Sequence, residues 1–138
     1  MTKPLDGVRI LDWTIWQQGP VSTMMLADLG AEVIKIEERT GGDPGRGVLS
    51  IAGALVGATS GPNFYFEANN RHKKSITLDL KNPEAIEIVH KLAAKSDVFV
   101  QNFRKGVAEK LGIGYDALSK HNSKLIYASA TGYGPIGP

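Results

Sequence analysis

Two segments, LDLKNPEA and QNFRKGVAEKLG, place cationic, amide and aromatic side chains directly after apolar runs. Guanidinium and ammonium groups bind phosphate oxygens, and a neighbouring aromatic ring can stack on a nucleobase. These residue types therefore indicate a ligand that contains an adenine-phosphate group, although they indicate no particular reaction. The candidate binding residues are Lys81, Asn102, Phe103, Arg104, Lys110 and, from an earlier loop, Arg39.

The same residues also have a purely structural interpretation. A phenylalanine at the end of an apolar run is commonly part of the core. An arginine beside it can form a surface salt bridge. The sequence alone leaves both interpretations open for Phe103 and Arg104.

The expected secondary structure brings the two segments to one edge of a sheet. Runs rich in β-branched residues predict strands that alternate with helices, which is typical of a Rossmann-like α/β fold with a mostly parallel sheet covered on both faces. Such sheets bind ligands beyond the carboxyl ends of their strands, where both segments fall. The predicted strands span residues 8–14, 32–37, 75–80, 98–102 and 125–130.

Helical periodicity predicts two longer helices and two short ones. The first begins at Gly19-Pro20 and the second after Asn82-Pro83, while the short helices fall near residues 106–111 and 115–121. Residues 38–70 are rich in glycine and predict a long loop that is functional or partly disordered. The predicted apolar stripes consist of Val21, Met24, Met25 and Leu29 in the first helix, and Ala85, Ile88, Val89 and Leu92 in the second.

The sequence contains no other convincing nucleotide-binding or metal-binding motif. GYGPIG (residues 132–137) has the spacing of a dinucleotide fingerprint but contains a proline, and GGDPGRG (residues 41–47) lacks the Gly-Lys-Ser/Thr of a Walker loop. Glu37 could bind a ribose, but the turn before the first helix lacks the necessary glycines. No metal site is expected, because no metal-binding spacing surrounds His72, His90 or His121.

Composition predicts one ordinary globular domain. The 138 residues are 42% hydrophobic and 22% charged, with no cysteine and no apolar run long enough for a membrane span. We therefore expect no membrane association, no disulfides and a cytoplasmic location. Residues 71–138 carry 11 basic and 6 acidic side chains, which could attract a polyanion or simply be solvated lysines. No arginine-rich run favours nucleic acid.

Eight segments, taken in order, resemble a known family. From Pro4 to Pro138 the chain is similar to the N-terminal part of the class III coenzyme A transferases, which include formyl-CoA transferase, carnitine CoA-transferase and α-methylacyl-CoA racemase. The opening MTKPLDG and the glutamine before Gly-Pro are most similar to the formyl-CoA transferase branch. The segments are PLDGVRILDWT, QQGP, LADLGAEVIKIE, GGDPGRG, SITLDLK, QNFRKGV, KLGIGYDAL and LIYASATGYGPIGP.

The resemblance implies coenzyme A (CoA) as the ligand of a Rossmann-like large domain. In the family a smaller second domain follows, and two chains interlock as a homodimer. Residues 1–138 would then be an incomplete CoA-binding domain that lacks the small domain and the return segment. The branch often has a cation where this chain has Glu38, so the role of Arg39 is open.

The resemblance also assigns individual residues. It places Gln17 and Gln18 near the thioester, with Gln17 in a supporting catalytic role. Around the adenine and ribose it places Leu78, Asp79, Leu80 and Lys81. Along the nucleotide and pantetheine it places Asn102, Phe103 and Arg104, with Lys110 in the position of a family cation.

The implied reaction moves CoA from an acyl-CoA thioester to a free carboxylic acid, as between formyl-CoA and oxalate. In the family an aspartate carboxylate attacks the acyl carbonyl, giving an anhydride and then an aspartyl thioester. No aspartate here lies in a matching context, so the nucleophile is expected beyond Pro138 and the chain is expected to be an inactive fragment of a parent enzyme. Two alternatives stay open: an acyl-CoA racemase or epimerase of the same family, and a non-catalytic CoA- or nucleotide-binding module.

Overall fold

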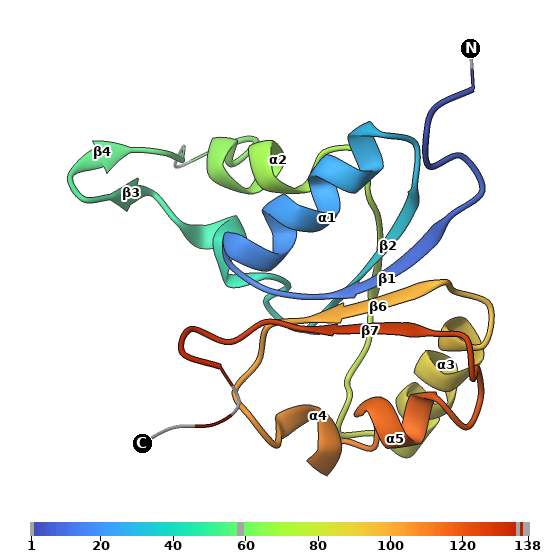
Figure 1. Ribbon diagram of the computed structural model, residues 1–138. Coiled ribbons are helices and arrows are strands. Elements are labelled where there is room, and N and C mark those ends of the chain that lie inside the picture. Colours follow the sequence, from blue (N-terminus) through green and yellow to red (C-terminus); the bar gives the residue numbers. More distant parts are fainter. Residues whose placement is uncertain (1, 58–59, 135, 137–138) are drawn as a thin grey trace.

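A parallel five-stranded sheet forms the centre of the protein (Figure 1). The computed structural model describes residues 2–57, 60–134 and 136. The strand order is β5-β2-β1-β6-β7, which confirms the predicted parallel α/β sheet. The strands are β1 (Arg9–Trp13), β2 (Glu32–Glu37), β5 (Lys74–Thr77), β6 (Val98–Gln101) and β7 (Ile126–Ser129).

Helices cover both faces of this sheet (Figure 1). One face carries α1 (Gln18–Asp28) and α2 (Phe64–Asn70). The other carries α3 (Pro83–Ala93), α4 (Val107–Lys110) and α5 (Tyr115–Leu118). Among the described residues, no helix is both long and apolar enough to cross a bilayer.

The order in which strands are added to the sheet changes side at β1. The chain continues from β1 to β2 and β5 on one side, then returns to β6 and β7 on the other. The loops that follow β1 and β6 therefore diverge at neighbouring strand ends. A crevice at such a switch point is the usual ligand site of an open parallel sheet.

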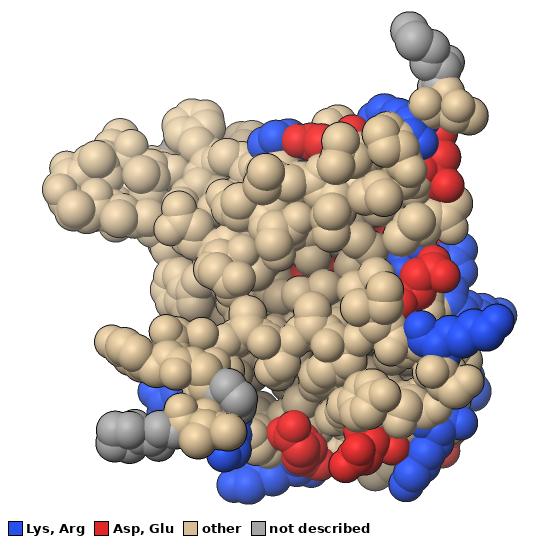
Figure 2. All heavy atoms as spheres, viewed as in Figure 1, with Lys and Arg blue, Asp and Glu red and all other residues tan. Residues whose placement is uncertain are grey.

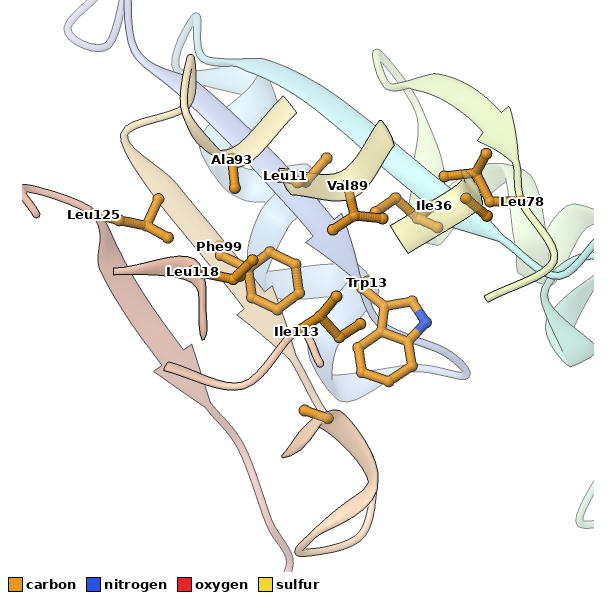
Figure 3. Close-up of a cluster of buried hydrophobic side chains, with 12 residues drawn as sticks. Leu11, Trp13, Ile36, Leu78, Val89, Ala93, Phe99, Ile113, Leu118 and Leu125 are labelled. Atoms are coloured by element: carbon orange, nitrogen blue, oxygen red, sulfur yellow. The ribbon is translucent and has the colours of Figure 1, made fainter. Parts of the chain in front are cut away.

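Hydrocarbon packing fills the face beneath α3, α4 and α5 (Figure 3). Leu11 and Phe99 point from β1 and β6 into this cluster, where they meet Val89 of α3, and all three side chains are fully buried. A smaller cluster of Ile10, Ala27, Ala31, Val33 and Val100 lies beneath α1. Alternate residues of each strand thus serve opposite faces.

The predicted apolar stripe of α1 was wrong in part. Met25 is 57% exposed and Leu29 is 45% exposed, although Met24 is buried as predicted. The first turn of α1 lies close to the residue that follows β1: a Cβ added to Gly19 would lie only 2.5 Å from Thr14 Cβ. The buried face consists of Gly19, Pro20, Thr23, Met24 and Ala27.

The stripe of α3 follows the prediction more closely. Ala85 and Val89 are buried as predicted, whereas Ile88 is exposed and Ala93 takes the remaining core position. His90 is half-buried, and its Nε2 lies 2.8 Å from Gly112 O.

The predicted long loop at residues 38–70 contains regular elements. They are the 3₁₀ helix η1 (Pro44–Gly47), an antiparallel hairpin of β3 (Ser50–Ile51) and β4 (Ala54–Leu55), and α2. Asn63 caps α2 by accepting a hydrogen bond from Phe66 N (3.0 Å), a sequence signal that could have revealed this helix. The hairpin projects from the body as an uncharged protrusion (Figure 2).

Candidate functional site

A pocket of about 830 Å³ opens at the carboxyl ends of the strands. This volume lies within the range of roughly 300–1,000 Å³ that is typical of small-molecule sites. The pocket lies at the edge of the sheet where the sequence predicts a ligand. Its lining includes Trp13 at the end of β1, Thr14 and Ile15 after it, Ile36 and Glu37 of β2, Glu38, residues 40–44, residues 78–81, Phe103, Val107 and Leu111.

Phe103 serves both the core and the pocket. Its ring stacks on Trp13 with centroids 4.0 Å apart and an interplanar angle of 21°. Trp13 belongs to the buried cluster, and Phe103 packs against that cluster while also lining the pocket. The structural and the ligand-facing interpretations of Phe103 are therefore compatible.

The segment after β5 forms a second wall. The strand ends at Thr77 rather than at residue 80 as predicted, so Leu78–Lys81 leave the sheet. Leu78 N donates to Glu37 O (2.9 Å), and Asp79 Oδ1 accepts from Lys81 N (3.1 Å). This turn places all four predicted residues, two of them apolar, in the lining of the pocket.

Several predicted ligand residues lie outside this lining, so their ligand contacts stay predictions. Gln17 and Gln18 are exposed at the start of α1. The amide of Asn102 bonds the backbone of Ile15. The predicted residues outside the lining are Gln17, Gln18, Arg39, Asn102, Arg104 and Lys110.

Glu38 lines the pocket at the position where the resemblance led us to expect a cation. Its Oε2 accepts hydrogen bonds from Thr40 N and Gly41 N, both at 2.8 Å. The backbone hydrogen bond from Gly41 lowers the pKa of Glu38, and the one from Thr40 contributes further. This carboxylate thus shapes the loop that borders the pocket.

Glu37 fastens the GGDPGRG loop to the sheet. Its carboxylate accepts from Arg46 Nε (2.7 Å), Ser75 Oγ (2.6 Å) and Asp43 N (2.9 Å). Burial raises the pKa of Glu37, but these hydrogen bonds outweigh burial and lower the pKa to about 2. Arg46 also lies 3.7 Å from the centroid of the Phe66 ring, a cation–π contact. This part of the loop that was predicted to be functional or partly disordered is thereby held in place.

Two buried ion pairs lie beneath α1 and the adjoining loop. Lys35 Nζ is 2.8 Å from Asp43 Oδ2, which has no other hydrogen-bond partner among the described residues. Lys73 Nζ is 2.9 Å from Asp12 Oδ2, and Asp12 also accepts from the hydroxyl of Thr23 (2.6 Å). Burial lowers the pKa of Lys73, and Asp12 opposes that effect.

Sequence reasoning missed all four of these charged residues. The only signal is that Asp12 and Lys35 lie inside strands whose neighbouring residues are strongly apolar. Within the part of the chain that the structure describes, no cluster of three or more His, Cys, Asp or Glu could hold a metal ion.

The sequence model of a family described as CoA-transferase family III matches residues 5–138. The chain belongs to this family. It is 47% identical over 136 residues to succinyl-CoA:glutarate CoA-transferase of Mus musculus, a match that covers 99% of the chain and 30% of that protein. It is 44% identical over 138 residues to formyl-CoA:oxalate CoA-transferase of Rhodopseudomonas palustris (strain HaA2), covering 100% of the chain and 31% of that protein.

A solved family III structure has the same fold. The crystal structure of Rv3272 from M. tuberculosis superposes with a TM-score of 0.87 at 45% identity, covering 99% of the chain and 37% of that structure. The chain therefore spans about a third of the length of its family III relatives. Because relatives named for different acids are similarly identical to it, identity alone assigns no single branch.

Proposed function

We propose that this family III chain binds CoA in the pocket at the carboxyl end of its sheet. The observation that carries the proposal is one cavity lined by Phe103 and by the whole Leu78–Lys81 turn, the segments predicted to hold a nucleotide. Apolar walls suit the adenine ring and the pantetheine chain, and Lys81 supplies a cation for a phosphate. Arg104 and Lys110 are exposed cations that we assign to the same ligand.

We further propose that the whole protein transfers CoA between an acyl-CoA and a small carboxylic acid. Relatives named for oxalate and for glutarate support a dicarboxylate acceptor. Gln17 is the residue that we assign to oxyanion or carboxylate recognition, because an amide donor stabilises developing negative charge. The aspartate nucleophile implied by the family is assigned to no residue of this chain. A homodimer and a cytoplasmic location are expected for the whole protein.

Calorimetric titration of the chain with CoA tests the binding proposal. We expect CoA to bind and NAD not to compete, because the turns after β1 and β2 lack the glycine fingerprint of a dinucleotide site. Dephospho-CoA should bind more weakly if cations hold the 3′-phosphate. Failure to bind CoA, or equal affinity for NAD, would overturn the proposal.

Transfer itself requires a separate assay. Incubation with succinyl-CoA and glutarate, and with formyl-CoA and oxalate, should give no product with these 138 residues alone and should give product with a longer chain that carries them. Exchange of an α-proton with deuterated solvent, without transfer, would instead support the racemase alternative.

A further inference from the structure

Buried and half-buried side chains hold the loop between β1 and α1 at three consecutive residues. Lys35 Nζ donates to Thr14 O (2.7 Å). Asn102 accepts from Ile15 N through Oδ1 (2.9 Å) and donates to Ile15 O through Nδ2 (2.8 Å). Trp16 N then donates to Asp43 Oδ1 (3.2 Å). The loop is thus tied to β2, to the end of β6 and to the loop before η1.

The holding groups are themselves fixed. Lys35 is 1% exposed and paired with Asp43, which also accepts from Gly45 N (2.8 Å). Asn102 uses both amide heavy atoms on Ile15, so its orientation is set by two bonds. Because Lys35 and Asp43 have partners outside the loop and Asn102 is oriented by two bonds, the loop is preorganised before any ligand arrives.

The backbone of this loop is strained at Trp16, so the hydrogen bonds hold it in an unfavourable conformation. Trp16 has a φ of 67°, a left-handed conformation that is unfavourable for a non-glycine residue. Trp16 is 49% exposed, so burial of its side chain does not account for this conformation. The residue that follows is Gln17, at the start of α1.

We propose that Lys35 and Asn102 are positioning residues of the CoA site. Neither lines the pocket, whereas Thr14 and Ile15, the residues they hold, do. They act through the backbone, fixing this part of the pocket wall and the exit of the chain toward Gln17. The inference rests on the proposed binding of CoA, and for Asn102 it adds a role beyond the direct ligand contact predicted from sequence.

Hydrogen exchange and calorimetry on the same variants test this role. In Asn102→Ala we expect the Ile15 amide to exchange at least about tenfold faster, and the Kd for CoA to rise by about tenfold. Lys35→Met should also raise the Kd, and this loss cannot be that of a pocket-lining contact. Asn102→Asp keeps an acceptor for Ile15 N and should give an intermediate exchange rate, so the test survives if the alanine variant unfolds.

Asn122→Ala is the matched control. Asn122 also makes two side-chain hydrogen bonds to the backbone, with its Nδ2 donating to Ala93 O (3.3 Å) and Ser96 O (2.8 Å), but near the amino ends of the strands and outside the pocket lining. It should leave Ile15 exchange and CoA affinity unchanged even where it lowers the stability of the fold.

The outcomes separate the two proposals. Unchanged Ile15 exchange in Asn102→Ala, or faster exchange with unchanged CoA affinity, would overturn the positioning role while CoA binding stands. A wild-type chain that binds no CoA would overturn the proposed function and this role with it.

Discussion

The two faces of the sheet are built from different chemistry. Beneath α3, α4 and α5, the core is almost entirely hydrocarbon, with Leu11 and Phe99 at its centre (Figure 3). Beneath α1 and α2, this face of the sheet contains the buried charged residues Asp12, Lys35 and Glu37 as well as apolar residues. Asp12, Lys35 and Glu37 are all buried, so these three charges of this face lie inside the protein.

The two faces therefore have different roles: the apolar face stabilises the fold, and the charged face positions loops. Hydrophobic burial is non-directional and stabilises the fold without fixing any loop. Paired charges and hydrogen bonds are directional, and here they reach the loops after β1 and β2, both of which border the pocket. The pocket lies where the two faces meet, between Trp13 of the apolar face and Asp43 of the charged face. We therefore expect the charged face to be the one where small chemical changes matter most.

Removing one partner of a buried ion pair should produce the largest effect. Lys73→Met leaves Asp12 buried without its cation, and such a change typically costs about 3–5 kcal/mol. Urea unfolding followed by circular dichroism measures this loss. Lys74→Met is the matched control, because the neighbouring Lys74 is 72% exposed and pairs with Glu32 at the surface. Equal losses in the two variants would contradict the contrast between buried and surface charges.

The acid response of Glu37 should give the next largest effect. Its pKa is about 2 in the fold, below the ordinary value of 4.5, so its contribution is fully present above about pH 4.5 and is lost as the pH falls through about 2. We expect a loss of about 2–3 kcal/mol over this range. Wild type should be more stable than Glu37→Gln near neutral pH, and the two should converge near pH 2. A constant gap in unfolding free energy would show that the carboxylate is not the cause.

Close packing of the first turn of α1 against Thr14, the residue that follows β1, predicts a smaller effect. Gly19→Ala would place a Cβ 2.5 Å from Thr14 Cβ, and overpacking of this kind costs about 1–3 kcal/mol. Gly47→Ala is the control, since its added Cβ would meet nothing within 4 Å. Thermal unfolding should separate the two variants. If Gly19→Ala were as stable as Gly47→Ala, the first turn of α1 could move away from Thr14 without loss.

The apolar face could be predicted from sequence, and the charged face could not. The strands that form both faces could be located because runs of β-branched residues are typical of strands. The predicted bounds of β2 are identical to the observed Glu32–Glu37. Alternation in EVIKIE, however, is typical of a strand with one solvated face. Lys35 is buried only because Asp43 arrives from a later loop, a contact that no local pattern encodes.

The candidate site divides in the same way. Phe103 and residues 78–81 follow strands directly, so their convergence on one pocket could be predicted from strand order alone. The contributions of Thr14, Ile15 and residues 40–44 could not, because the path of those loops depends on Asn102, Lys35 and Glu37. Sequence reasoning thus found the residues that follow strands and missed those that need distant partners.

The smallest predicted effect tests whether a cation contributes by its place at a strand end. Arg104 follows β6 beside Phe103, whereas Lys120 follows α5 on the chain that leads to the amino end of β7. Both side chains are exposed, so neither change should alter the stability of the fold appreciably. Calorimetry should show that Arg104→Ala weakens CoA binding by about 3- to 10-fold, the loss of one charge-assisted contact near solvent, while Lys120→Ala leaves it unchanged. Equal weakening would mean that overall positive charge attracts CoA, because only a local contact distinguishes the two cations.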